Sequence, residues 1–427
     1  MPQFASILFQ LAGSLALFMY GMQLASDGIQ RAAGERLQRT VNFMTKNTFF
    51  AVVTGALVTV LLQSSSAATV MVVSFANAGL LGLVQAVGVI MGSNIGTTLT
   101  GWIIAAAGVS KFSILGLAVP VFGIGYVMTL SRRSSDSFKS YGESLMGFAM
   151  IFLGLDFLSR AIPSPGGEAL LFLQKVSTLG WLTTAICIAA GTVFTVLVRA
   201  SSATLAIAIG LASKGIIDFP MAAAITLGAN IGTTVDALLL SLKSNTNAKR
   251  AACAHIMFNL LGTLWVIILF RPFLLLVDWA VPAPVSTASM GAHLAMLHTL
   301  FNVINTLVLF PFTRHYAALI SRIIKSKAED EKPVRLRYVA AQLVGSPELN
   351  LISARREIAD MAGVARKMFG SYRVDLAEAP ETMAERLTTM KQWMDYADSM
   401  HDELSAFLLE RSEEPTSELQ SPNTISY

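Results

Sequence analysis

The feature that most limits the fold is a series of apolar runs, each long enough to cross a lipid bilayer. A membrane-spanning helix needs about 20 mostly apolar residues. Runs of that kind occupy residues 4–24, 81–107, 112–130, 141–162, 217–242, 252–272 and 292–313. Only 14% of the 427 residues are charged, against about 25% in a soluble domain. We therefore expect an all-α membrane protein with about seven transmembrane helices.

Two further apolar runs, residues 48–80 and 184–214, are too long for one span and too short for two. Each has small hydroxyl residues at its centre. Backbone that turns inside the membrane is tolerated only where protein or water surrounds it. We interpret both runs as re-entrant hairpins, which enter the membrane and return to the same side.

Lysine and arginine gather in four segments outside the apolar runs, at residues 31–46, 131–140, 243–250 and 314–327. Seven crossings and two hairpins place all four on one side, and such clusters mark the cytoplasmic side. We therefore expect the cytoplasmic (inner) cell membrane, with the N-terminus outside and the C-terminal segment in the cytoplasm. Basic residues confined to loops, without interleaved aromatics, do not indicate nucleic-acid binding.

An internal repeat relates the two halves of the apolar region. Residues 55–98 match residues 191–234 at a constant offset of 136, and Asn94-Ile-Gly-Thr-Thr98 recurs as Asn230-Ile-Gly-Thr-Thr234. The first copy holds an odd number of crossings, so the second would be inverted, as is typical of secondary transporters. We expect repeat 1 at residues 1–135 (hairpin 48–80, broken helix 81–107) and repeat 2 at residues 136–315 (hairpin 184–214, broken helix 217–242, one extra helix).

Each predicted hairpin turns at a serine motif, Gln63-Ser-Ser-Ser66 or Arg199-Ala-Ser-Ser202. The first N–H groups of a helix have no intrahelical partner and lie at the positive end of its dipole, so two such ends with serine hydroxyls would bind an oxyanion. The alternative is that these serines let helices pack closely. The candidate anion-binding residues are Gln63, Ser64, Ser65, Ser66, Arg199, Ser201 and Ser202.

The two Asn-Ile-Gly-Thr-Thr strings are candidates for cation binding. Glycine beside asparagine loosens a helix and frees carbonyls, and Asn and Thr add neutral oxygens, which is how transporters hold Na⁺. The alternative is a Gly-x-x-x-Gly packing contact through Gly92 and Gly96, or Gly228 and Gly232. The candidate sodium-binding residues here are Asn94, Thr97, Thr98, Asn230, Thr233 and Thr234, together with Asp236, which follows the second string.

Other polar residues at membrane depth are few. A guanidinium suits a tetrahedral oxyanion, so Arg199 is a candidate ligand; it could instead form a structural ion pair with Asp236 or Asp156. His-x-x-Phe-Asn occurs at His255 and again at His298, and this spacing favours an interhelical polar contact. We expect no enzyme, because a serine hydrolase does not explain a duplicated serine motif.

The paired serine and Asn-Ile-Gly-Thr-Thr motifs, in this order, resemble the type II sodium–phosphate cotransporter family, bacterial branch, over about residues 1–315. The resemblance implies Na⁺-coupled uptake of inorganic phosphate by alternating access, with the serine motifs as the substrate and ion site. It implies Na⁺ as the coupling ion, with Gln63 and Ser65 among the sodium-binding residues, and no cofactor. One departure is that Arg199 and Ala200 stand where the family often repeats Gln-Ser; Arg199 would then supply a positive charge that Na⁺ supplies elsewhere.

Residues 349–374 and 381–410 predict two amphipathic helices, and residues 326–410 resemble part of a cytoplasmic PhoU-type helical domain. Asp398 and Asp402 resemble that domain's metal-binding signature, although a solvated acidic face explains the same spacing. Residues 411–427 lack a helical pattern and resemble translated sequencing adapter, so we expect a foreign or disordered tail on a truncated reading frame.

Two other functions stay open on the sequence. One is a phosphate-responsive regulatory membrane protein with little flux, and the other is a Na⁺ symporter of another oxyanion, such as arsenate or sulfate. We expect inorganic phosphate, Na⁺ and membrane lipid as partners; whether two copies form a homodimer stays open as well.

Overall fold

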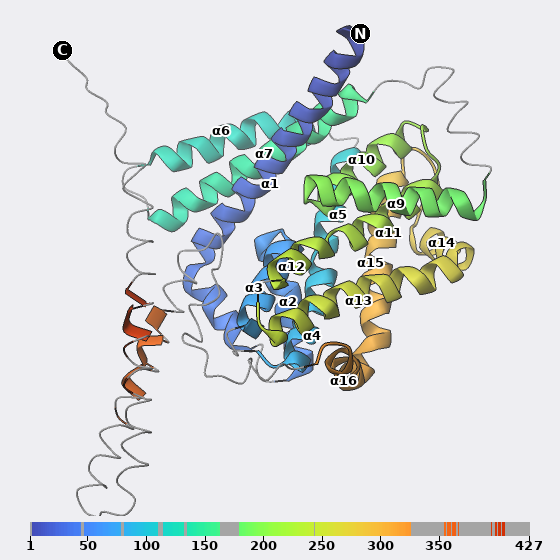
Figure 1. The fold of residues 1–427 in the computed structure, drawn as a ribbon. Coiled ribbons are helices and arrows are strands. Elements are labelled where there is room, and N and C mark those ends of the chain that lie inside the picture. Colours follow the sequence, from blue (N-terminus) through green and yellow to red (C-terminus); the bar gives the residue numbers. More distant parts are fainter. Residues whose placement is uncertain are drawn as a thin grey trace, which may run out of the picture. The chain divides into compact units, whose positions relative to one another are not determined.

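The computed structural model describes residues 2–43, 47–77, 81–109, 114–131, 135–162, 179–242 and 244–325, and single residues between 354 and 405. Regular structure in these residues is helical throughout, as the apolar runs predict, and none of them lies in a strand (Figure 1). The helices are α1 (Pro2–Phe43), α2 (Thr48–Leu62), α3 (Ser65–Asn77), α4 (Leu83–Gly96), α5 (Thr98–Val109), α6 (Ile114–Leu130), α7 (Asp136–Ala161), α9 (Trp181–Val198), α10 (Ser201–Ser213), α11 (Phe219–Gly232), α12 (Thr234–Ser241), α13 (Thr246–Ile268), α14 (Phe270–Ala280), α15 (Met290–Leu309), η1 (Phe310–Phe312) and α16 (Thr313–Ile323).

Seven helical segments among the described residues are long and apolar enough to cross a membrane. They are Ala5–Ala32, Leu83–Ala106, Asp136–Ala161, Trp181–Val198, Phe219–Ser241, Thr246–Ile268 and Met290–Ile323. The number of candidate spans agrees with the prediction, but the segments that form them are not all the predicted ones. Helix α9, expected as one arm of a hairpin, has 18 residues and a mean hydropathy of 2.0, whereas α6, expected to span, falls among the shorter apolar helices. The chain is a multi-pass membrane protein.

Several predicted spans end elsewhere in the structure. Helix α1 continues to Phe43, well past the apolar run at 4–24, because good helix formers such as Ala, Gln and Arg extend a helix beyond its apolar part. The predicted span 252–272 is divided between α13 and α14. Pro272 explains the division, since its ring clashes with the carbonyl four residues earlier, that of Ile268.

The chain forms two compact units. The first comprises residues 1–73, 83–244 and 249–324, and the second comprises residues 74–82, 245–248 and 325–427. In the described part of the second unit, Asn245 binds Asn77 twice. Its backbone N–H donates to Asn77 Oδ1 over 2.9 Å, and its side-chain Nδ2 donates to the Asn77 carbonyl over 2.6 Å.

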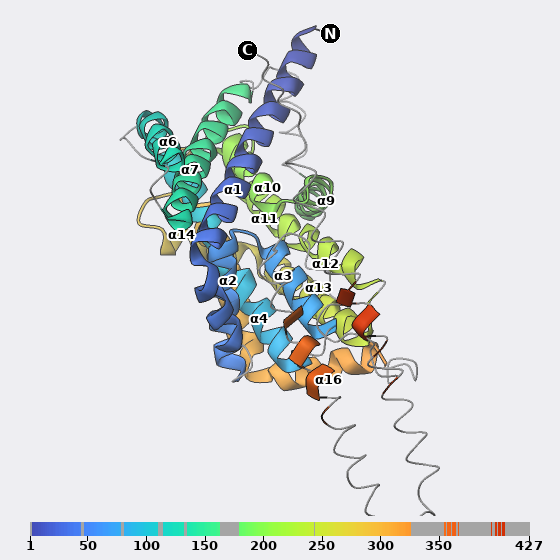
Figure 2. The same ribbon diagram turned by 90° about the vertical axis from the view of Figure 1, so that its left-hand side faces the viewer.

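Within the first unit, α1, α6 and α7 lie side by side (Figures 1 and 2). Helix α7 approaches α1 closely at two glycines, Gly147 against the backbone of Ala25 and Gly154 against that of Phe18. The hydroxyl of Ser144 also donates to the Ala25 carbonyl over 3.3 Å. Small residues and interhelical hydrogen bonds are the usual means of helix association in lipid.

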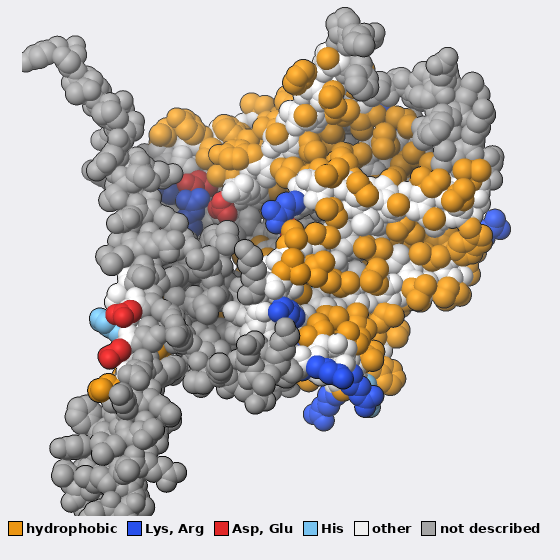
Figure 3. All heavy atoms as spheres, viewed as in Figure 1, with side chains coloured by type: hydrophobic (Ala, Val, Ile, Leu, Met, Phe, Trp, Pro, Cys, Tyr) orange, Lys and Arg blue, Asp and Glu red, His pale blue; other side chains and the backbone are white. Residues whose placement is uncertain are grey.

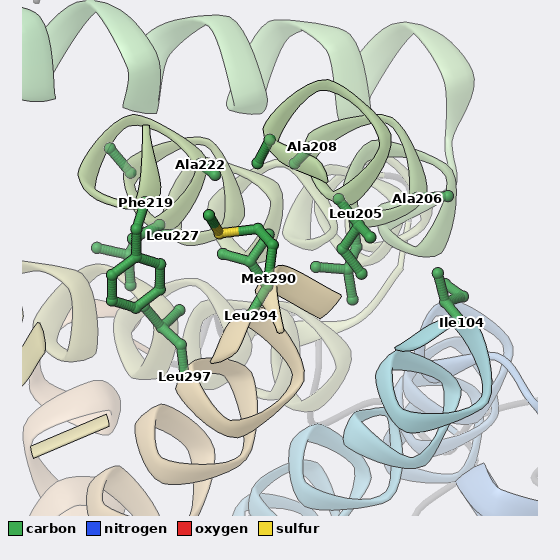
Figure 4. Close-up of a cluster of buried hydrophobic side chains, with 14 of the residues drawn as sticks. Ile104, Leu205, Ala206, Ala208, Phe219, Ala222, Leu227, Met290, Leu294 and Leu297 are labelled. Carbon is green, nitrogen blue, oxygen red and sulfur yellow. The ribbon is translucent and has the colours of Figure 1, made fainter. Parts of the chain in front are cut away.

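The largest cluster of buried apolar side chains joins α11 and α15 with α10 and α5 (Figure 4). Leu227 of α11 and Leu294 and Leu297 of α15 are fully buried in it, and Leu205 of α10 is 3% exposed. This cluster fixes α10 and α11, which carry part of the candidate site, against α15.

The surface has the distribution of side chains that a lipid environment requires. Large apolar side chains such as Trp279, Leu197 and Ile268 are strongly exposed, and Figure 3 shows apolar atoms over the face that includes α9, α13 and α14. Lysine and arginine side chains gather at the end of the unit beside α16 (Figure 3), whose own basic residues include Arg314 and Arg322.

Helix boundaries recur at the offset of the sequence repeat. α2 and α9 end 136 residues apart, and α3 and α10, α4 and α11, and α5 and α12 each begin 136 residues apart. Close backbone contacts recur as well: a methyl group on Gly92 would overlap the Val52 carbonyl, and one on Gly228 would overlap the Ile188 carbonyl. The two segments therefore share their local structure.

Candidate functional site

Each serine motif lies at a sharp corner between two helices. Gln63, between α2 and α3, has a φ of 48°, and Arg199, between α9 and α10, has a φ of 59°. In the described residues these are the non-glycine residues with positive φ. Left-handed backbone is unfavourable for such side chains and persists where surrounding contacts impose it. Surrounding contacts thus impose a left-handed corner at both equivalent positions.

The helices that leave the corners begin with serines. Ser65 and Ser66 open α3, and Ser201 and Ser202 open α10. The hydroxyl of Ser64 accepts a hydrogen bond from the Ala67 N–H over 3.1 Å and so caps α3. No side chain caps α10. The first N–H groups of α10 therefore remain available to an anion.

Arg199 forms an ion pair with Asp236, the first of the two alternatives that its sequence position allows. Its Nε and Nη2 lie 2.8 and 2.7 Å from Asp236 Oδ1. The Arg199 side chain is 67% exposed and that of Asp236 is 14% exposed. Two of the five guanidinium N–H groups point at Asp236, and the described residues offer no partner for the other three. Asp156 pairs instead with Arg160 over 2.7 Å.

The first corner has a neutral counterpart of this ion pair. Thr100 Oγ1 donates to Gln63 Oε1 over 3.2 Å, and Gln63 Nε2 donates to the Val60 carbonyl over 2.7 Å. Ser26 Oγ also donates to the carbonyl of Leu62, the last residue of α2, over 2.5 Å. Thr100 and Ser26 were not among the residues expected to matter, because Thr100 lies just beyond the Asn94–Thr98 string and Ser26 just beyond the apolar run at 4–24.

The Asn-Ile-Gly-Thr-Thr strings interrupt their helices less than the sequence suggests. The interruption is a single residue, Thr97 between α4 and α5 and Thr233 between α11 and α12, and Thr233 keeps right-handed helical angles. Carbonyls expected to be free are occupied, since Thr98 donates to Ile95 O and Thr234 donates to Ile231 O, at 2.7 and 2.8 Å. The carbonyls beside each interruption are therefore bonded by local side-chain hydrogen bonds.

The glycines of these strings make the close packing contacts that were the alternative to cation binding. Gly92 and Gly96 lie against α2, and Gly228 and Gly232 lie against α9. The asparagines differ from each other. Asn94 Nδ2 donates to the Ile90 carbonyl over 2.9 Å, and its Oδ1 has no partner among the described residues. Asn230 Oδ1, in contrast, is 2.9 Å from His298 Nε2.

The two His-x-x-Phe-Asn segments have the same construction. Phe258 and Phe301 are fully buried, and each asparagine donates to the carbonyl of the histidine four residues earlier, over 3.1 Å for Asn259 and 2.9 Å for Asn302. Their Oδ1 atoms are buried, with no partner among the residues that the structure describes. The interhelical contact expected of this motif occurs at His298, which binds Asn230, whereas both nitrogens of His255 lack a partner in the described part of the chain.

Most of the predicted C-terminal domain, and all of the tail at 411–427, lies outside the described residues. Asp398 and Asp402 are described and exposed. The described residues contain no group of three or more His, Cys, Asp or Glu side chains that could hold a metal ion. The metal site at these two aspartates stays a prediction.

The chain is similar to several known proteins. It is 27% identical over 383 residues to a Salmonella typhimurium protein named "Putative inorganic phosphate export protein YjbB", covering 89% of this chain and 67% of that protein. It is 28% identical over 326 residues to the uncharacterized protein YqeW of Bacillus subtilis, covering 75% of this chain and 99% of that protein. Over 97 residues it is 40% identical to the sodium-dependent phosphate transport protein 2A of Rattus norvegicus, which is 22% of this chain and 15% of that protein.

The chain spans between 62% and 67% of the length of the YjbB proteins that it matches. No solved structure matches it significantly. A family model described as Na⁺/Pi-cotransporter matches residues 17–160 and 173–277, which is more than half of the chain. This is a family of transporters and not of enzymes, in agreement with the sequence analysis. The chain belongs to the Na⁺/Pi-cotransporter family.

Proposed function

We propose that the protein couples the transport of inorganic phosphate to Na⁺ and works by alternating access. The observation that carries the proposal is the pair of corners at Gln63 and Arg199, each followed by a helix that begins with serines. Helix N-termini and hydroxyls bind oxyanions, and the free N–H groups of Arg199 add a charged donor. The phosphate-binding residues in this proposal are Gln63, Ser64, Ser65, Ser66, Arg199, Ser201 and Ser202.

The proposed architecture is a pair of inverted repeats, at residues 1–135 and 136–315, with re-entrant hairpins at 48–80 and 184–214. The recurrence of helix boundaries at the offset of 136 supports the repeat. The 15 residues of α2 and the 13 of α3 support a hairpin in the first repeat, because a spanning helix needs about 20. The four basic segments support a cytoplasmic C-terminus and an outside N-terminus.

Na⁺ is proposed to bind beside the first corner, where neutral oxygens are available. Asn94 Oδ1 has no partner in the part of the chain that the structure describes, and Gln63 and Thr97 are only partly buried. Neutral side-chain and backbone oxygens at an interrupted helix are typical ligands of Na⁺ in transporters. At the second corner the equivalent or adjacent residues are Asn230, Thr233, Thr234 and Asp236, of which Asp236 is already paired with Arg199.

The direction of net transport follows the ion gradients, because a coupled transporter is reversible. An inward Na⁺ gradient would drive uptake, as the resemblance to sodium–phosphate cotransporters implies. The printed name of the YjbB relatives, which refers to phosphate export, favours export as a second candidate. Both candidates require phosphate to cross the membrane through the same site.

Phosphate flux in proteoliposomes tests the proposal. We expect radiolabelled phosphate to accumulate with an inward Na⁺ gradient and to leave preloaded vesicles with an outward one. The Ser65→Ala/Ser201→Ala variant should lose both fluxes, whereas Ser140→Ala, on α7, should keep them. Phosphate flux that ignores both Na⁺ gradients would contradict coupling. Phosphate binding without flux would favour the regulatory protein, and sulfate competing as well as phosphate would favour another oxyanion.

A further inference from the structure

The two corners are held by equivalent contacts of different charge. Thr100 follows Gln63 by 37 residues and bonds to its side chain, and Asp236 follows Arg199 by 37 residues and bonds to its side chain. Both partners are the third residue of the helix after the string, since α5 begins at Thr98 and α12 begins at Thr234. A neutral pair in the first half thus corresponds to an ion pair in the second half.

The two pairs offer different atoms to a small cation. Gln63 Oε1 and Thr100 Oγ1 are neutral oxygens with further lone pairs, which a cation can use. A guanidinium has donors only, and that of Arg199 already occupies Asp236 Oδ1 through two N–H groups. A second cation beside Arg199 would be repelled by its fixed charge.

The asparagines of the two strings also differ in whether their side-chain oxygen is open to a cation, and again the first half is the more available. Asn94 Oδ1 has no partner among the described residues, so it remains an available ligand in the first half. Asn230 Oδ1 accepts a hydrogen bond from His298 Nε2 over 2.9 Å. This contact is independent of the ion pair, and it occupies one of the two lone pairs of the equivalent oxygen in the second half, whereas both lone pairs of Asn94 Oδ1 are open to a ligand.

We propose that only the first of the two equivalent corners binds Na⁺, and that Arg199 takes the place of a Na⁺ at the second. Asp236 then holds the Arg199 side chain and does not coordinate the coupling ion. The inference rests on the proposed function for the identity of the ion. It assigns one Na⁺ per chain to the corners and leaves the free N–H groups of Arg199 to the anion.

Equilibrium binding of ²²Na⁺ to the purified full chain in detergent, without phosphate, tests this assignment. We expect one Na⁺ per chain in the unmodified protein. Arg199→Gln removes the fixed charge, frees the Asp236 carboxylate and should raise the number to two. Gln63→Arg/Thr100→Asp copies the second corner into the first and should lower the number to zero. Arg160→Gln, which frees Asp156 elsewhere, is the matched control and should leave the number at one.

Several results would overturn the inference: no Na⁺ or two Na⁺ in the unmodified protein, an unchanged number in Arg199→Gln, or a retained Na⁺ in Gln63→Arg/Thr100→Asp. If Arg199→Gln does not give a monodisperse protein, the Gln63→Arg/Thr100→Asp variant decides the question alone. Because no phosphate is present, the result is separate from transport. A protein that binds Na⁺ as expected but moves no phosphate would end the proposed function and leave this assignment standing.

Discussion

His298 Nε2 lies 2.9 Å from Asn230 Oδ1, so α15 is bonded to α11 at the second Asn-Ile-Gly-Thr-Thr string. An amide oxygen only accepts hydrogen bonds, and Nε2 therefore carries the proton of the ring. Both residues are buried, at 4% and 6% exposure. The contact joins a helix outside the repeated segment to one of the two strings, and in the described residues it has no equivalent at Asn94.

Replacing His298 with alanine should destabilise the protein, because Asn230 Oδ1 would then be buried without a partner. A buried unsatisfied polar group costs about 1–3 kcal/mol. Thermal unfolding of the purified protein in detergent measures the loss. His315→Ala, at an exposed position of α16, is the control and should change little. Equal stability of the two variants would contradict the importance of the contact.

Gly92→Ala and Gly228→Ala should each destabilise the protein, because the added methyl would overlap a backbone carbonyl of the neighbouring helix. Overpacking of this kind costs about 1–3 kcal/mol. Gly123→Ala in α6 is the matched control, since no atom lies within 4 Å of the added carbon. It should leave the unfolding temperature unchanged or raise it, as alanine favours helix. A similar loss in all three variants would show that packing is not the cause.

The hydroxyls of Thr195 and Thr204, 2.5 Å apart, connect α9 to α10 across the second corner. Thr195→Val should destabilise the protein by about 1–3 kcal/mol, because it leaves the Thr204 hydroxyl buried and unpaired. The double variant Thr195→Val/Thr204→Val should cost less than the sum of the two single variants, since residues in contact are not additive. Strict additivity of the three unfolding free energies would mean that the two hydroxyls do not interact.

Ser66→Ala and Ser202→Ala should each weaken phosphate binding, because each removes one hydroxyl at a corner. A hydrogen bond to a charged group contributes about 1.5–3 kcal/mol, which is roughly a 10- to 150-fold loss of affinity. Isothermal titration of the purified protein with phosphate measures the change. Ser14→Ala, which removes a hydroxyl bonded within α1, should bind as the unmodified protein does. A loss at only one of the two corners would argue against a site shared by both.

Much of the local fold follows from the sequence repeat. The constant offset of 136 predicts that whatever structure surrounds Gln63 recurs at Arg199, and both corners have left-handed backbone. Apolar length was a weaker guide. It predicted seven spans, but it could not tell that α9 reaches 18 residues while α6 falls short, because helix ends depend on caps and neighbouring contacts as well as on hydropathy.

The contacts that define the site were harder to predict. The sequence allowed Arg199 to pair with Asp236 or with Asp156, and only the packing of α9 against α11 and the turn into α12 decides between them. The glycines and asparagines of the two strings predicted loosened helices with freed carbonyls, whereas the helices are interrupted only at Thr97 and Thr233. Glycine and asparagine do weaken a helix, but Gly92 packs closely against α2 and Gly228 against α9. Helices gain most of their stability from such tertiary packing, which cannot be read from composition.

The central claim is that phosphate and Na⁺ move together, and the most direct test is to let phosphate drive Na⁺. Proteoliposomes with equal Na⁺ on both sides and an inward phosphate gradient should accumulate ²²Na⁺, because coupling between two ligands is reciprocal. The accumulation should disappear in the Ser65→Ala/Ser201→Ala variant. Phosphate entry without any accumulation of ²²Na⁺ would contradict the account.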